Sequence, residues 1–473
     1  MEEKLVSSVT KQAFRNVKFT ILAQVIVFIL GLVKSVIFPK YMTVSSFGYW
    51  QIYVLYSTYI GLSYLGFNDG IYLLYGDYDY NELPKNKISA SIKIYMLQLL
   101  IISFTTIGLI VCFVNSPNKA FALIATAITI PIMGIYGVLI YVLQITNQIK
   151  KYSFFSIVDK VIMLVLCFFL LFFSNAKFEY IIFSDVISKI IVVCIMCYDC
   201  KELIFNTYFD FKIAFKEYKN NIFVGFSLML SGLTGMLVTG IGRFFVESLG
   251  NISDYAYYSF GISITNIVLI MIVAISYVLY PTLKRCEESE YPSIFVYIDR
   301  FLYIFEFIML ISYFVIYIFV IVYISNYTPV LEYLNLLFIV IFLQGKMTLL
   351  NNTFYKILRK EKKLLKENVL CIIVFILFSL ISFGSTHNIK AIALSTAVAM
   401  LYRCYFSELY LSKLLNIEYK RQILNEIIFL FVFYIISEFS IISIGFFMYT
   451  ILVIVMCLNN KVFIKSVVKK FIR

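Results

Sequence analysis

Long hydrophobic stretches fill this chain from about residue 17 to residue 459 and leave only short connections between them. A helix that crosses a bilayer needs roughly 20 mostly apolar residues. We find fourteen such stretches, nearly all long enough to span. They lie at 17–38, 46–72, 88–114, 119–145, 152–174, 178–200, 221–247, 253–281, 294–324, 328–354, 364–384, 388–412, 423–438 and 443–459. The longest connection, 201–220, is too short to hold a water-soluble domain.

The composition excludes a soluble globular protein. The chain is 62% hydrophobic and 14% charged, with a mean hydropathy of +0.91, whereas soluble domains carry about 25% charged residues. A transmembrane β-barrel is excluded too, because its strands alternate apolar and polar residues. The sequence therefore predicts an all-α integral membrane protein of about 14 transmembrane helices.

The positive charges are distributed unevenly among the connections. Most of the 40 lysines and arginines fall in the connections on one side of the expected helices. The other side holds only Lys40, Lys119, Lys177 and Lys390. By the positive-inside rule, this pattern places both termini in the cytoplasm of a multi-pass protein of the cell's inner (plasma) membrane. The net charge of +13 thus indicates contact with anionic membrane lipids, as at 356–366 and 461–473, and no nucleic-acid partner.

Cysteine and histidine give no metal or disulfide site. Cys194, Cys197 and Cys200 are spaced like metal ligands, but they lie on an apolar helix without a neighbouring histidine. The only histidine, His387, lies in a short outer turn. We expect no disulfide framework, no metal and no cofactor.

The two halves of the chain begin alike. The segments 16–50 and 220–259 each open with asparagine, continue as a glycine-bearing helix and then meet one base, Lys34 or Arg243. A small residue between aromatic residues follows in both. This pattern is typical of two six-helix lobes related by a parallel repeat around a central cavity. The expected organisation is an N-terminal lobe (1–200), a cytoplasmic linker (201–220), a C-terminal lobe (221–414), and two further helices with a basic tail (415–473).

Three short motifs resemble a known family. They are the base with its short outer turn and Phe47-Gly48-Tyr49, the second helix ending in Leu65-Gly66-Phe67-Asn68-Asp69-Gly70, and Tyr280-Pro281 before a basic loop. In these the chain resembles the polysaccharide transporters (Wzx-type) of the multidrug/oligosaccharidyl-lipid/polysaccharide flippase superfamily. The resemblance implies a flippase for polyprenyl-pyrophosphate-linked oligosaccharides, with its last two helices similar to a groove for the lipid tail. It also implies that Lys34 and Arg243 face the central cavity.

Charged residues at membrane depth are costly and usually functional. Lys34 and Arg243 could neutralise a pyrophosphate during its passage, or they could extend to the outer interface. Glu306 and Arg403 both fall near the middle of their helices. They could form a buried ion pair, or Glu306 could bind the proton of a coupled transporter. The pairs Asp185/Lys189 and Asp159/Lys160 favour structural roles, with the latter two expected to point apart, and Lys93 and Lys346 remain unassigned.

Two polar stripes could contact a sugar. Tyr49, Tyr53 and Tyr56 share one face of the second stretch, and Ser259, Ser263 and Asn266 repeat the same spacing in the eighth. Aromatic faces and hydroxyl groups are the partners that sugars need. Because the chain has 38 tyrosines, the first stripe could also arise from composition alone.

The sequence predicts a flippase that moves lipid-linked oligosaccharide by alternating access and works with other membrane proteins of polysaccharide assembly. We expect no enzyme, since no catalytic motif stands out in a plausible context. Two alternatives stay open. One is a cation-coupled exporter of drugs or other small molecules from the same superfamily, and the other is a membrane-embedded polymerase or transferase. The sugar, the coupling ion and the oligomeric state are not encoded in any pattern that we recognise.

Overall fold

The described part of the chain is helical throughout. The computed structural model describes residues 26, 29–76, 78–173, 177–283, 287–418 and 420–465, with side chains omitted at 171–173, 270–282 and 420. Within these residues, eleven segments are long and apolar enough to cross a membrane. This confirms an all-α membrane protein, while the count of fourteen helices stays a prediction.

The chain divides into two compact units. Unit 1 is Met1–Met236 and unit 2 is Leu237–Arg473. The division falls inside one long helix, α9 (Phe211–Leu249), so residues 211–220 of the expected linker are helical. Only Cys200, the short helix α8 (Lys201–Ile204) and the six residues 205–210 separate α9 from the preceding long helix.

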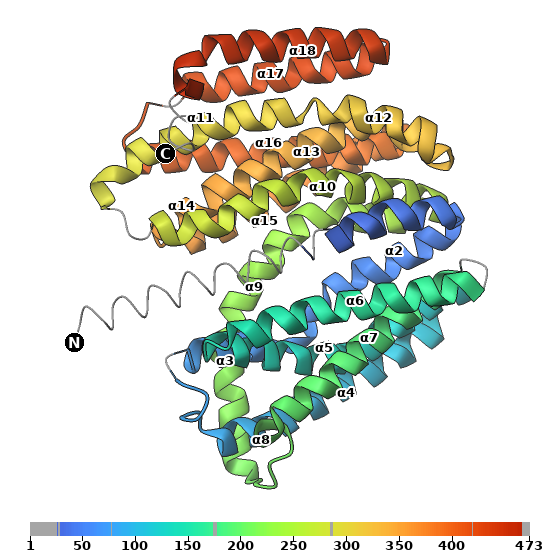
Figure 1. Cartoon of the computed structure of the whole chain (residues 1–473), viewed down its shortest axis with the longest axis vertical. Coiled ribbons are helices and arrows are strands. Elements are labelled where there is room, and N and C mark those ends of the chain that lie inside the picture. The colour runs from blue at the N-terminus through green and yellow to red at the C-terminus, as the bar shows by residue number, and fades with distance from the viewer. Residues whose placement is uncertain are drawn as a thin grey trace. The chain divides into compact units, whose positions relative to one another are not determined.

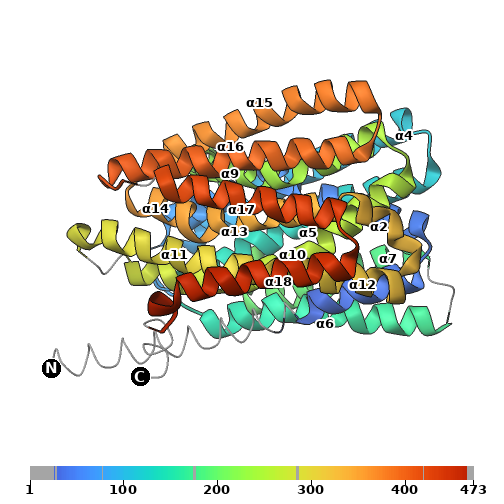
Figure 2. The ribbon, with the colours of Figure 1, turned by 90° about the horizontal axis from the view of Figure 1, so that it is seen from above.

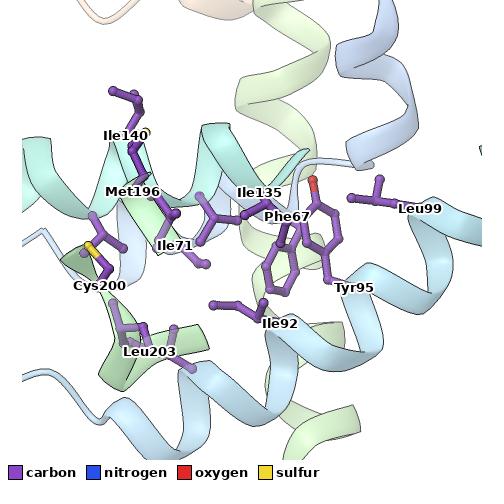
Figure 3. Close-up of a cluster of buried hydrophobic side chains, with 14 of the residues drawn as sticks. Phe67, Ile71, Ile92, Tyr95, Leu99, Ile135, Ile140, Met196, Cys200 and Leu203 are labelled. Carbon is purple, nitrogen blue, oxygen red and sulfur yellow. The ribbon is translucent and has the colours of Figure 1, made fainter. Parts of the chain in front are cut away.

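Unit 1 begins, in its described part, with helical residues 29–41. Its longer helices are α2 (Val44–Thr58), α3 (Phe67–Leu74), α4 (Lys85–Phe113), α5 (Pro117–Ile145), α6 (Ile149–Phe173) and α7 (Phe178–Asp199). The helix α5 lies at the centre and packs against α2, α3, α4, α6 and α7. Figure 3 shows part of the apolar core, in which Phe67 stacks on Tyr95 with ring centroids 4.1 Å apart.

The second expected span is not one continuous helix. It is divided into α2, a 3₁₀ turn at Ile60–Tyr64 and α3. Leu65 and Gly66 between them adopt positive φ values of 50° and 86°. A left-handed residue ends a helix, and glycine takes this conformation without the strain of a Cβ. Local backbone conformation therefore overrides the hydrophobic pattern at this position.

The break lets α3 approach the first half of α9 very closely. A Cβ added to Gly225 would lie 2.0 Å from the Gly66 carbonyl oxygen, and one on Gly70 would lie 2.0 Å from the Asn221 carbonyl oxygen. Small residues permit such backbone contact between membrane helices. The motif from Leu65 to Gly70 is thus a packing motif inside unit 1.

Unit 2 contains the remaining helices. They are α10 (Ile252–Leu283), α11 (Tyr291–Met309), α12 (Ser312–Tyr323), α13 (Leu334–Lys346), α14 (Asn352–Ile357), α15 (Glu361–Thr386), α16 (Ile389–Leu414), α17 (Lys420–Phe439) and α18 (Ile442–Asn459). The helix α13 is almost completely buried and packs against α10, α11, α16 and α17. The pairs α15–α16 and α17–α18 are antiparallel hairpins (Figures 1 and 2).

Two further expected spans are also interrupted. The stretch 294–324 divides into α11 and α12 at Leu310–Ile311. The stretch 328–354 becomes a 3₁₀ segment (Ser325–Glu332), α13, a π-helical turn (Met347–Asn351) and α14. The hydrophobic pattern does not register these changes, because apolar residues predominate on both sides of each interruption. π turns occur frequently at functional sites, and this one directly follows Lys346.

Candidate functional site: buried charges in each unit

A charged hydrogen-bonded group links α2 to α7 in unit 1. The hydroxyl of Tyr53 donates to Asp185 Oδ2 at 2.5 Å, and Lys189 Nζ lies 2.5 Å from the same oxygen. Lys189 also donates to the Tyr53 hydroxyl at 3.2 Å. The expected pair of Asp185 and Lys189 is therefore present, and it includes a tyrosine of the predicted sugar-binding stripe.

Lys34 belongs to the same surroundings. Its amine interacts electrostatically with Asp185 of α7 and with Asp159 and Lys160 of α6. Lys160 Nζ lies 3.2 Å from Asp159 Oδ1, so these neighbours do not point apart as expected but form an ion pair. A flexible lysine side chain can bend back to its neighbour on a helix. With Lys189, the group holds three lysines and two aspartates.

The other tyrosines of the α2 stripe differ from one another. Tyr49 packs against Phe178 at the start of α7, with ring centroids 5.2 Å apart. Tyr56 is half-buried. The stripe thus turns Tyr49 and Tyr53 toward α7 within unit 1.

Arg243 lies in unit 2, on the second half of α9. It is half-buried and interacts electrostatically with the hydroxyls of Tyr255 and Tyr258 on α10. A Cβ on the adjacent Gly242 would lie 2.5 Å from the Tyr258 hydroxyl, so glycine makes room for that tyrosine. The Tyr258 hydroxyl lies 3.3 Å from Thr396 Oγ1 of α16.

The second polar stripe is partly occupied by contacts within α10. Ser259 is fully buried, and the Ser263 hydroxyl donates to the Ser259 carbonyl at 2.8 Å. Asn266 is half-buried. The side chains of Tyr280 and Pro281 lie outside the described residues.

Glu306 and Arg403 are not paired with each other. Arg403 instead donates to Asn368 Oδ1 at 2.8 Å and to Gln344 Oε1 at 3.3 Å. Glu306 is 2% exposed, and neither carboxyl oxygen has a hydrogen-bond partner among the described residues. Of the two expected roles of Glu306, the structure thus removes the ion pair with Arg403.

A network around Lys346 was missed from the sequence. Its amine lies 2.8 Å from Asp299 Oδ1 of α11, 2.8 Å from Glu408 Oε1 of α16, and forms an ion pair with Glu426 of α17. The amide of Gln422 donates to Asp299 Oδ2. Asp299 and Glu306 are seven residues apart and share one face of α11, and Glu306 interacts electrostatically with the network. The seven-residue spacing of these two acidic residues is the sequence signal that could have indicated the network.

The network is deeply buried and rich in carboxyl groups. Lys346, Asp299, Glu408 and Glu426 are each at most 1% exposed. Three carboxyl groups contact one amine, and Glu306 interacts electrostatically with this group. Removing charges from water is costly unless they are paired, so this group forms a single electrostatic unit. Its members come from α11, α13, α16 and α17, which it joins.

The remaining candidates stay without a chemical role. His387 is exposed and ends α15 in a left-handed conformation. Cys194, Cys197 and Cys200 form no disulfide. Among the described residues, no cluster of histidine, cysteine or acidic side chains could hold a metal ion. Lys93 donates to the Asn206 and Tyr208 carbonyls and so fastens the segment before α9 to α4.

A family model described as "Polysaccharide biosynthesis protein" matches residues 13–287. The chain belongs to this family. The match includes Lys34, Arg243 and both polar stripes, and it ends before the Lys346 network. The resemblance expected from the three motifs is therefore confirmed. Comparison with curated proteins gives no match.

Solved structures of transporters share the fold. The structure titled "Lipid II flippase MurJ, inward closed conformation" is 15% identical, with a TM-score of 0.69 over 96% of this chain and 99% of that chain. An outward-facing multidrug resistance MATE family transporter of the MOP superfamily is 11% identical, with a TM-score of 0.56 over 85% and 95%. A MOP superfamily transporter from Pyrococcus furiosus, described as having a binding pocket of reverse polarity, is 11% identical, with a TM-score of 0.51 over 86% of this chain and 96% of that chain. At these identities the likeness concerns the fold.

Proposed function

We propose that this member of the family is a flippase for polyprenyl-pyrophosphate-linked oligosaccharides in the cytoplasmic membrane. It would carry each unit from the inner to the outer leaflet by alternating access. The observation that carries this proposal is the family match together with the likeness of fold, over almost the whole chain, to a lipid II flippase.

The cargo's head group requires positive charge inside the protein. A pyrophosphate must cross about 30 Å of hydrocarbon, and fixed cations offset the loss of its hydration. Lys34 and Arg243 are proposed to bind it, Lys34 as a point charge and Arg243 through paired donors. The group around Lys34 has three lysines and two aspartates, so it keeps an excess of positive charge when all are ionised. This excess supports affinity for an anion.

The sugar would be held by less charged groups. Tyr56, Ser263 and Asn266 are half-buried and offer a ring, a hydroxyl and an amide. Tyr49 and Tyr53 pack against α7 within unit 1, and Ser259 is buried within unit 2, so each is proposed to support the sugar-binding side chains of its own unit.

Glu306 is proposed to couple transport to protons. A carboxyl group that is buried without a hydrogen-bond partner is costly when ionised and is favoured when neutral. Its approach to the Lys346 network would make its protonation sensitive to rearrangement of α11 and α17. Uptake and release of one proton on opposite sides of the membrane would then drive the cycle.

The proposed orientation places both termini in the cytoplasm. It rests on the distribution of lysine and arginine among the connections. The anionic lipids of the inner leaflet and the membrane proteins that build and polymerise the oligosaccharide are the expected partners.

A cation-coupled exporter is the second candidate, because the MATE transporters share the fold. The excess of carboxyl groups around Lys346 favours it. One assay distinguishes the two. The purified protein is reconstituted into liposomes with a fluorescent lipid-linked oligosaccharide, and an impermeant reagent quenches the label in the outer leaflet. The flippase proposal expects quenching of both leaflets' pools, compared with about half in protein-free liposomes. Export of a fluorescent organic cation without any flipping would support the exporter instead.

A further inference from the structure

A groove opens on unit 2 between α11, α17 and α18, with a volume of about 690 Å³. One face of each helix lines it. On α17 this face includes Arg421, Asn425 and Phe429, which are spaced by four residues and so lie above one another. A ligand pocket typically has about 300–1,000 Å³, so the groove is large enough for a head group and the first part of an acyl chain.

The lining changes from charged to apolar along the groove. The start of α17 and the end of α18 contribute Arg421, Asn425, Asn459 and Asn460, joined by Arg300 of α11. Further from these helix ends the walls are formed by Phe429, Leu452 and Val455. Such a gradient fits an amphiphile with its polar head at the helix ends. Glu418 also lies at the polar end, which leaves two guanidinium groups and one carboxylate there.

Two neighbouring residues hold the guanidinium group of Arg300 in place at this site. It donates through Nε and Nη2 to Asn460 Oδ1, at 3.2 and 2.9 Å, and its guanidinium lies 4.9 Å from the centroid of the Phe463 ring. Because a guanidinium has five N–H donors, three remain for a ligand. Paired donors of this kind match the oxygens of a phosphate.

The groove is also backed by the buried charge network. Gln422 lines it and donates to Asp299 Oδ2, and Arg300 directly follows Asp299 in the chain. A ligand that orders α11 and α17 at this point therefore acts on the same elements that hold Lys346.

From this geometry we infer that the groove binds one anionic phospholipid of the surrounding leaflet, with its phosphate between Arg300 and Arg421 and an acyl chain along Phe429 and Leu452. The lipid fastens the α17–α18 hairpin to α11. This site is separate from the pyrophosphate-binding residues of the proposed function, and its occupancy does not depend on transport.

The test measures lipid binding to the full-length protein by native mass spectrometry after release from detergent micelles. Phosphatidylglycerol and phosphatidylcholine with identical acyl chains are compared. We expect phosphatidylglycerol to bind at least tenfold more tightly. The double variant Arg300→Gln/Arg421→Gln should lose this preference, while Lys212→Gln, an exposed lysine of unit 1 outside the groove and outside both basic stretches, should keep it. Equal binding of both lipids, or an unchanged preference in the double variant, would overturn the inference.

A second variant protects the test against a folding defect. Val455→Trp fills the apolar part of the groove and leaves both arginines in place, so it should also weaken phosphatidylglycerol binding.

A third measurement adds a polyprenyl pyrophosphate as a competitor of phosphatidylglycerol. If that compound displaces phosphatidylglycerol from the wild-type protein at equal concentration, the groove belongs to the transported lipid, and the inference of a resident phospholipid is wrong. Liposome flipping, measured in parallel, reports on the proposed function independently.

Discussion

Lys346 Nζ lies 2.8 Å from Asp299 Oδ1, and both side chains are shielded completely from solvent. Asp299 lies in the middle of α11 and Lys346 is the last residue of α13, at the start of the π-helical turn. Since Glu408 and Glu426 contact the same amine, this one lysine is shared by carboxyl groups from three helices. Removal of one charge from such a network leaves its partners unpaired in a medium of low polarity.

Replacement of Lys346 by Met should therefore destabilise the protein strongly. Loss of one partner from a buried ion pair typically costs roughly 3–5 kcal/mol. The matched control is Lys151→Met, which breaks the exposed pair of Lys151 and Asp199 at 2.8 Å and should cost under about 1 kcal/mol. Thermal unfolding in detergent, followed by circular dichroism, measures both. Equal melting temperatures for the two variants would contradict the role given to Lys346.

The glycine contact between α3 and α9 gives a second prediction. Gly225→Ala would bring a Cβ to 2.0 Å from the Gly66 carbonyl oxygen, and the backbones would have to separate. Overpacking of this kind costs about 1–3 kcal/mol. Gly232→Ala on the same helix meets nothing within 4 Å and should stabilise the helix by up to about 1 kcal/mol. The first variant should lower the melting temperature and the second should raise it. A shift of the same direction and size in both variants would contradict the close contact.

The sequence predicted the fold class because membrane insertion depends on long apolar stretches, and these are visible without a structure. It did not predict the breaks at Leu65-Gly66 and at Met347–Asn351. Both are changes of backbone conformation inside long and mostly apolar segments, and neither the length nor the hydropathy of a segment reports on backbone conformation. The family motif from Leu65 to Gly70 was recognised, but its role in packing α3 on α9 required the structure.

The charged residues also divide into those whose partners the sequence predicted and those whose partners only the structure revealed. Asp185 and Lys189 were predicted to pair because they are four residues apart on one helix, and local spacing suffices for that. Lys346 remained unassigned because its partners lie 47 to 80 residues away in the sequence. Arg403 was predicted to pair with Glu306 only because both residues lie near the middle of their helices. Depth does not fix the direction of a side chain, and Arg403 points to the neutral residues Asn368 and Gln344.

Membrane topology gives a third prediction. Reporter fusions at Asn118, Asn251 and Thr386 should report the outside of the membrane. Fusions at Asn86 and Lys362 should report the cytoplasm, because most basic residues lie in the connections on that side. Alkaline phosphatase and green fluorescent protein serve as complementary reporters. A consistent inversion would refute the proposed orientation, and an odd number of crossings would refute the map of fourteen spans.

The proposed coupling role of Glu306 gives a fourth prediction. Glu306→Gln keeps the shape of the side chain and removes its ability to exchange a proton. Flipping by the wild-type protein in liposomes should accelerate when a proton gradient is imposed, whereas the variant should lose this acceleration and keep its gradient-free rate. Glu332→Gln, which changes an exposed carboxyl group of the same unit, should respond as the wild type does. If Glu306→Gln still responds to the gradient, Glu306 is not the coupling group.

Charge at Lys34 and Arg243 gives the last prediction. If the two bases bind a pyrophosphate, charge should matter more than size at both positions. Arg243→Lys keeps the charge and loses only the paired donors, so it should retain part of the export of surface polysaccharide. Arg243→Gln keeps polarity without charge and should stop export, with a normal amount of protein in the membrane. Lys34→Gln should weaken export, and the double Gln variant should be no better than the worse single variant. Surface polysaccharide is measured on cells that lack the native gene and express each variant. An undiminished level in the double variant would show that these bases serve the membrane interface and not the cargo.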